Sequence, residues 1–386
     1  MSKFFHKETF PLLKYMGFWK PQELSKWKSI LYDIYSTIIV TLIMSSGLAQ
    51  FLGICFLSHT NLRVFMQNIF IGLTTMSICL KVVNWFYSLS KIINILEMLK
   101  QHPFECQTRE EYLIYHRLSS KNRRISITSL TYCMMSVAYY FIDQIVTIRP
   151  QRTLPLSAWL PYDYSNSSKW WFSSSYLALV QYLMAVFNEV YNVFFFELMM
   201  QSVAQVKILK NRLHVMMTTL VKAHSTKNHL TKNDLLMERE LYHKCVQYHI
   251  AILRLTRDIN SIFAPIMMVQ YLITSITLPS TVYLISKTMI CSRDFLKLGA
   301  YAAFLLQQML ILCYAGHRTY LEFDSIGDVL YTSDWIALRE SSKQSMKLML
   351  VSAQKPFVFD CFGMLKLDME AFKNALMLAY SIYNIF

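Results

Sequence analysis

Oxygen-bearing side chains recur at helical spacing near the end of the chain. From Asp368 to Phe386 no proline or glycine interrupts a helix, and aspartate is a preferred residue at a helix N-cap. Such a helix would be about 28 Å long, close to the hydrocarbon thickness of a bilayer. A polar face cannot lie against lipid, so we expect it to face either protein inside a bundle or water along an ion pathway. One face of this helix carries Glu370, Asn374, Met377 and Ser381, with Ile385 at its edge.

A second group of residues has side chains that could bind a metal. His243, Cys245 and His249 are zinc ligand types, but no further ligand cluster stands near them, and helical packing explains their spacing better. The sequence contains no P-loop, GxGxxG, HExxH or nucleophile-elbow motif, and its 8 cysteines do not form a disulfide framework. We therefore predict no catalytic residues, no metal and no cofactor, and we do not expect an enzyme.

The composition is that of a membrane protein. Hydrophobic residues make up 54% of the 386 residues and charged residues only 16%, too few for an ordinary soluble surface. The net charge of +14 does not indicate a nucleic-acid partner, because the basic residues gather in alternate loops. We predict an all-α polytopic membrane protein with seven transmembrane helices, near 31–56, 64–90, 125–148, 172–204, 260–285, 298–315 and 368–386.

Lysines and arginines predict the orientation of these spans. The N-terminal segment and the loops on its side hold 28 of them, and the opposite loops hold 7. The N-terminus is therefore predicted to be cytoplasmic and the C-terminus extracellular, the reverse of a G-protein-coupled receptor. Asn166 begins an N-x-S sequon in the longest external loop, 149–171, and is a candidate glycosylation acceptor.

Two further features concern the position of single segments in the membrane. Lys81 lies toward the cytoplasmic end of the second predicted span, where a lysine is expected to extend its side chain to the interface. The segment FPLLKYMGFWKP, residues 10–21, alternates aromatic and basic residues and is predicted to lie at the interface beneath the bundle.

Several motifs resemble those of insect odorant receptors. A KPF segment at 355–357 is followed by D-x-E-x-F at 368–372 and A-Y-S-x-Y-x-I at 379–385. Upstream stand Q-x-x-x-L-C-Y-x-G at 308–316 and S-I-G-D-x-L-Y at 325–331. The resemblance implies a subunit of an odorant-gated, non-selective cation channel. The short, hydrophilic segment 221–240 implies a ligand-tuning subunit, because the co-receptor has a much longer insertion there.

The resemblance also implies a ligand pocket in the outer halves of the second, third, fourth and sixth helices. Such a pocket would be mostly apolar and aromatic and would select small volatile organic molecules by shape. The candidate ligand-binding residues are Phe70, Leu73, Ser136, Tyr139, Tyr140, Tyr176, Val180, Leu183, Phe187, Tyr301, Phe304 and Leu305.

In the same family the last helix lines the ion pathway. On that basis Glu370, Asn374, Met377 and Ser381 would face the pathway and Ile385 would form its apolar gate. The family assembles as a tetramer, which here would be a heterotetramer with the co-receptor or a homotetramer. Tyr242, His249 and Trp335 are candidates for burial in its cytoplasmic anchor. The expected regions are 1–30, cytoplasmic; 31–204, ligand-binding bundle; 205–259, anchor; 260–315, helices five and six; 316–357, anchor; and 358–386, pore-lining helix.

The expected location is the plasma membrane of olfactory sensory neurons. A gustatory-type receptor channel, a seven-span transporter and a metabotropic receptor are the alternatives. The terminal T-Y-x5-Q-F signature of gustatory receptors is missing, and so are the internal repeats and broken helices that are common in transporters.

Overall fold

A computed structural model describes residues 9–385 of the chain except 22–23, 58–61, 152–153, 155–157, 164–165, 227–231, 291, 334 and 336–339. For some helical residues it describes the backbone alone: 62–67, 143–151, 223–226, 232–235, 341–342, 345, 382–383 and 385. The described chain consists of long helices and one short antiparallel hairpin. The elements are α1 Thr9–Tyr15, α2 Lys26–Leu57, α3 Leu62–Met98, α4 Arg109–Gln151, α5 Ser167–Thr226, α6 Lys232–Ser286, α7 Arg293–Tyr331, α8 Glu340–Ala353, β1 Asp360–Cys361, β2 Leu365–Lys366 and α9 Met369–Ile385.

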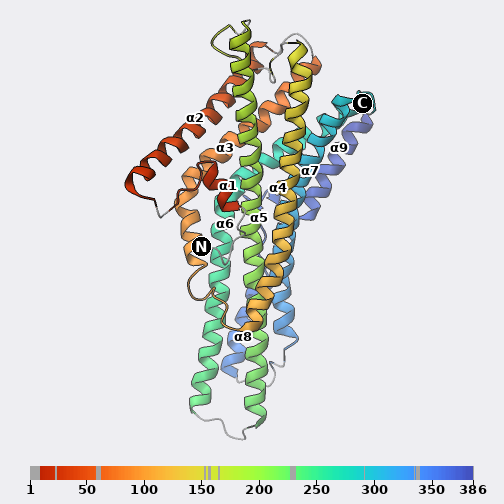
Figure 1. Ribbon diagram of the computed structural model, residues 1–386. Coiled ribbons are helices and arrows are strands. Elements are labelled where there is room, and N and C mark those ends of the chain that lie inside the picture. Colours follow the sequence, from red (N-terminus) through yellow and green to blue (C-terminus); the bar gives the residue numbers. More distant parts are fainter. Residues whose placement is uncertain are drawn as a thin grey trace.

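The helices form an elongated bundle in which successive long helices run in alternating directions (Figure 1). Six helices of the described residues, α2 to α7, are long and apolar enough to cross a membrane. Helix α9 has 17 residues, about 26 Å, and runs beside α7 as the seventh (Figure 1). The prediction of an all-α polytopic membrane protein is confirmed, while its orientation stays a prediction.

Helices α5 and α6 are much longer than a bilayer is thick. Helix α5 has 60 residues without a glycine or proline, and at about 1.5 Å per residue it extends roughly 90 Å. Helix α6 has 55 residues and continues through two prolines. Their far ends project together beyond the other spans (Figure 1), so the bundle has a second part outside the membrane-depth region.

Helix α5 lies at the centre of the bundle, packed against α4, α6 and α7. Over 190–209 it is buried almost all round, and polar side chains such as Glu197, Gln201 and Gln205 are buried there together with the apolar ones, so it has no solvent face. Aromatic rings join it to its neighbours. Phe195 stacks on Phe263 of α6 at 4.5 Å between centroids, and Phe194 meets Trp85 of α3 edge-on at 5.3 Å.

The N-terminal segment is part of this core. Phe18 stacks on Phe187 of α5 with ring centroids 4.1 Å apart, and its carbonyl accepts from the Trp85 indole at 2.9 Å. In α1, Thr9 donates to Glu197 of α5 at 2.9 Å. Phe18 and Trp19 are therefore buried against the bundle, and the position of this segment at the membrane interface stays a prediction.

The hairpin β1–β2 lies between α8 and α9 in the chain. Asp368 caps α9 as predicted, with its carboxylate accepting from the Ala371 N–H at 2.8 Å. The Leu367 backbone lies directly on α7 at Gly316, where a Cβ would stand 2.0 Å from the Leu367 carbonyl oxygen. Glycine is required there by this close approach, which fixes where α9 begins.

Candidate functional site

A cavity of about 480 Å³ opens between α3, α4, α5 and α7, with part of its wall from α6. Its lining is mostly apolar and aromatic, and its size lies in the range of small-molecule sites, roughly 300–1,000 Å³. Part of the predicted ligand-binding set lines it: Phe70, Ser136, Tyr139, Tyr140, Tyr301 and Phe304.

The rest of the predicted set lies outside this lining: Leu73, Tyr176, Val180, Leu183, Phe187 and Leu305. Phe187 faces Phe18, and Val180 is fully buried in the core. The Tyr176 hydroxyl lies 2.7 Å from that of Ser45 on α2. The α5 residues that do line the cavity are Ala178, Gln181, Tyr182, Met184, Ala185 and Asn188. Because α5 is buried almost all round, its apolar residues do not show which face meets the cavity.

Hydroxyl groups on the cavity wall bond to one another. Thr74 donates to the Phe70 carbonyl at 2.9 Å, and its hydroxyl lies 2.8 Å from that of Tyr301. Either hydroxyl of the Thr74–Tyr301 pair can be the donor. Thr74 was absent from the predicted site, although a Thr-Thr pair in an apolar span is a signal that could have indicated it.

Polar side chains lie directly beneath the cavity, and Lys81 is the most unusual of them. Its side chain is 0% exposed, and its ammonium donates to the side-chain oxygens of Asn188 at 2.6 Å and Asn192 at 2.8 Å. It also lies over the Tyr191 ring, 5.3 Å from the centroid. The expected extension of Lys81 to the interface is therefore wrong, because α5 supplies acceptors that the sequence of α3 could not reveal.

Glu189 is the acidic partner of this polar group. Its carboxylate accepts from Ser129 on α4 and from two α7 amides, Gln307 at 3.1 Å and Gln308 at 2.9 Å. The side chain is almost fully buried. Buried charges need such partners, so these contacts tie α3, α4, α5 and α7 together below the cavity.

The polar face of α9 points away from the rest of the chain. Ala371, Ala375 and Ala379 are buried against α6 and α7, and small residues allow this close packing. The predicted pathway residues on the opposite face are exposed: Glu370, Asn374, Met377 and Ser381. Ile385 ends the helix, and its side chain lies outside the described residues.

The predicted anchor residues occupy the projecting part of the bundle. Tyr242 is buried with its hydroxyl 3.5 Å from the Met217 sulfur, His249 is buried, and Trp335 packs partly buried against the core. In the part of the chain that the structure describes, no cluster of metal-ligating side chains occurs.

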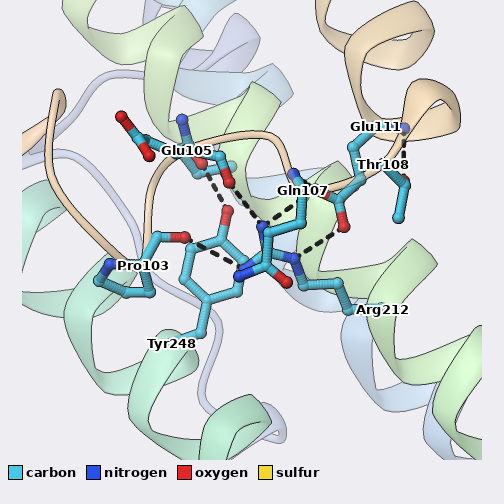
Figure 2. Close-up of polar contacts among 8 residues, drawn as sticks. Pro103, Glu105, Gln107, Thr108, Glu111, Arg212 and Tyr248 are labelled. Atoms are coloured by element: carbon cyan, nitrogen blue, oxygen red, sulfur yellow. Dashed lines mark hydrogen bonds and ion pairs between the residues drawn. The ribbon is translucent and has the colours of Figure 1, made fainter.

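An arginine joins three segments in this part of the molecule. Figure 2 shows the Arg212 guanidinium of α5 in a fork against Glu111 of α4, with atom distances of 2.9 and 3.0 Å. The same group donates to the carbonyls of Pro103 and Glu105, at 3.1 and 2.8 Å, and lies 4.4 Å from the Tyr248 ring centroid. All but one of the N–H donors of the guanidinium are thereby used. These bonds hold the α3–α4 connection onto α5 and α6.

The Glu111 carboxylate lies outside the predicted spans, and these contacts change its pKa. Burial acts to raise the pKa of Glu111, but hydrogen bonds from Arg212 and from the Gln107 N–H, at 2.7 Å, outweigh it. The pKa is therefore held below its ordinary value, and the carboxylate stays ionised at neutral pH.

Asn166 is exposed immediately before α5, where its carbonyl accepts from the Trp170 N–H at 2.9 Å. This position leaves the side chain accessible for modification. The structure describes Asn166 itself but neither residue 164 nor 165.

This chain is similar to known proteins in both sequence and fold. Residues 61–380 match the family model described as 7tm Odorant receptor. Odorant receptor Or1 of Anopheles gambiae is 22% identical over 395 residues, covering 96% of this chain and 91% of the relative. The match to Odorant receptor Or2 of the same species is also 22% identical, over 142 residues, and spans only 37% of the length of each protein.

A solved structure has the same fold. The insect olfactory receptor OR5 from Machilis hrabei superposes with a TM-score of 0.84 at 13% identity, covering 98% of this chain and 96% of that one. It has also been solved in complex with eugenol, with a TM-score of 0.83. The likeness in fold and the family match over most of the chain agree, and this chain belongs to the insect odorant receptor family.

Proposed function

We propose that this protein is the ligand-tuning subunit of an odorant-gated, non-selective cation channel and that its ligands bind in the cavity between α3, α4, α5 and α7. The observation that carries the proposal is the cavity itself, which is small-molecule sized and lined by aromatic and apolar side chains. Such walls bind volatile organic molecules through burial and ring contacts. The Machilis receptor OR5, which has this fold, has been solved in complex with eugenol.

The exposed polar face of α9 supports the channel part of the proposal. A spanning helix with exposed Glu370, Asn374 and Ser381 cannot present them to lipid, so that face belongs on a water-filled pathway shared between subunits. We place the protein in a tetramer with co-receptor subunits, in the plasma membrane of olfactory sensory neurons. Its external side would carry a glycan on Asn166.

Replacing Tyr301 with alanine should change the ligand response. The ring is part of the cavity wall, so its removal enlarges the site and takes away an aromatic contact. We expect half-maximal concentrations to change by about tenfold for part of a panel of volatiles, with a shift toward bulkier molecules. Currents are recorded from cells that express this chain together with the co-receptor.

The control for Tyr301→Ala is Tyr87→Ala, which removes an exposed tyrosine of α3 outside the cavity lining. Surface labelling of both variants separates ligand recognition from folding. Unchanged responses in Tyr301→Ala, at normal surface amounts, would move the ligand site elsewhere.

Replacing Ile385 with serine tests the gate. Apolar side chains around an axis exclude water when the channel is closed, so a small polar residue should raise the ligand-independent current or alter the permeability ratio. Leu376, which is exposed on the same helix but outside the predicted polar face, is the matched position for a serine control. Basal current and permeability equal to those of Leu376→Ser would remove Ile385 from the gate.

A further inference from the structure

Asn188 belongs to both the ligand cavity and the polar group beneath it. Among the residues of α5 that line the cavity it is the last in the chain, and Ile78 is the last from α3. Because α3 and α5 run in the same direction (Figure 1), these two residues lie at the same end of the lining, which we call the floor. Asn188 is thus the point at which a ligand could meet the polar group.

Lys81 fixes which end of the Asn188 amide faces the cavity. A lysine ammonium has three donors and no acceptor, so the amide must turn its oxygen toward it, as the 2.6 Å contact shows. A second amide oxygen, from Asn192, also accepts from the Lys81 nitrogen, at 2.8 Å. The Asn188 NH₂ group is therefore directed away from Lys81.

The NH₂ group of Asn188 has room for an external acceptor. Within the described residues no group accepts a hydrogen bond from it, and it is not one of the fully enclosed polar atoms that lack a partner. The Asn192 nitrogen, by contrast, is enclosed. The Asn188 nitrogen therefore combines a free donor with access to the cavity.

The neighbours of this donor make it selective. The lining also includes the apolar side chains of Ile78, Met184 and Ala185. Higher on the wall, the Tyr301 and Thr74 hydroxyls bond to each other. A donor in an apolar site discriminates strongly between ligands with and without the matching acceptor, because binding the wrong ligand leaves it unpaired.

We infer that the Asn188 amide, oriented by Lys81, is a hydrogen-bond donor that selects volatile ligands carrying an accepting oxygen, such as a ketone or ester carbonyl, over hydrocarbons of the same shape. The inference rests on the proposed function, in which the cavity is the ligand site, and it adds the chemical class of the ligand. Asn188 contacts the ligand, and Lys81 is a positioning residue that acts through it.

The test uses ligand pairs that differ in one atom group. The probes are the methyl ketones from hexanone to decanone and the alkenes in which a CH₂ group replaces each carbonyl oxygen. They are applied to cells expressing the full chain with the co-receptor. We expect ketones to reach half-maximal current at about tenfold lower concentration than their alkene counterparts.

Two variants test the residues. Asn188→Asp keeps an acceptor for Lys81 but has no donor for the ligand, so the preference for ketones should disappear while the alkene response stays. Lys81→Met removes the charge that orients the amide and should reduce the preference, with Asn188 still present. Surface labelling accompanies each recording, and the comparison of ketone with alkene in the unmodified chain requires no variant to fold.

The outcomes separate the inference from the proposed function. Equal potency of ketone and alkene in the unmodified chain overturns the inference, as does a preference that survives in Asn188→Asp. Activation by other volatiles but by no ketone overturns it as well. Absence of current with every volatile overturns the proposed function, and the inference with it.

Discussion

The Gly316→Ala variant is expected to lose most of its ligand-evoked current and to unfold at a clearly lower temperature in detergent. The added Cβ would stand 2.0 Å from the Leu367 carbonyl oxygen, and it would also lie 3.0 Å from the Leu367 side chain. Backbone atoms cannot move aside as the end of a flexible side chain can, so the hairpin must shift away from α7. Overpacking of this kind costs about 1–3 kcal/mol or more, and the shift is transmitted to α9, which begins two residues later.

The matched control is Gly299→Ala in the same helix. A Cβ at Gly299 meets no atom within 4 Å, so this change should leave the current unaltered and raise helix stability by up to about 1 kcal/mol. Thermal unfolding and current are measured for both variants. If Gly316→Ala behaves like Gly299→Ala, the hairpin does not press on α7 as described.

Replacing Arg212 with methionine should destabilise the protein to a similar extent, because it removes a buried positive charge rather than creating a steric clash. The Glu111 side chain is only 3% exposed, and the change would leave its carboxylate with the Gln107 N–H but without a positive partner. The carbonyls of Pro103 and Glu105 would lose the guanidinium donor as well. Removing one partner of a buried pair costs about 3–5 kcal/mol, so we expect little folded protein at the cell surface.

The control for Arg212→Met is Lys244→Met, in an ion pair with Glu240 whose side chains are 59% and 66% exposed. An exposed pair contributes about 0–1 kcal/mol, so this variant should fold like the unmodified chain. Adding Glu111→Gln to Arg212→Met removes the unpaired charge and should recover part of the lost stability. No recovery would mean that Arg212 acts mainly through the carbonyls and the Tyr248 ring.

The same pair gives a dependence on pH. The pKa of Glu111 is lower in the folded protein than in the unfolded chain. Its contribution to the free energy of unfolding is therefore fully present above the ordinary glutamate pKa, and it is lost as the pH falls through the pKa of the folded state. Acidification should therefore lower the unfolding temperature of the unmodified protein more than that of the Glu111→Gln variant.

Helix existence and the face of α9 could be predicted from the sequence because both depend on local patterns. Long apolar stretches indicated the spans, and Asp368 and the alanines of α9 indicated its cap and its packed side. The cavity face of α5 could not be predicted, since Val180, Phe187 and Asn188 are all buried on one helix that its neighbours enclose on almost every side. Where periodicity is absent, only the neighbouring helices decide which residue meets a ligand.

The position of Lys81 shows the same limit for a charged residue. In the sequence of α3 alone, a lysine near a span end is expected to reach water. Its acceptors, Asn188 and Asn192, lie 107 and 111 residues further along the chain. Local sequence cannot show such a partner, and the burial of Lys81 follows only from the packing of α3 on α5.

The long stretch of sequence between Lys81 and its acceptors has a consequence for biosynthesis. During translation α3 enters the membrane before Asn188 and Asn192 exist, and at about 5–20 residues per second the wait is roughly 5–20 s. In that interval a lysine within the bilayer costs about 2.5–3.5 kcal/mol, which the apolar residues of α3 or an assisting factor must offset. The insertion of α3 therefore becomes secure only when α5 arrives, and a ribosome that stalls between them would leave a segment that cellular quality control can recognise.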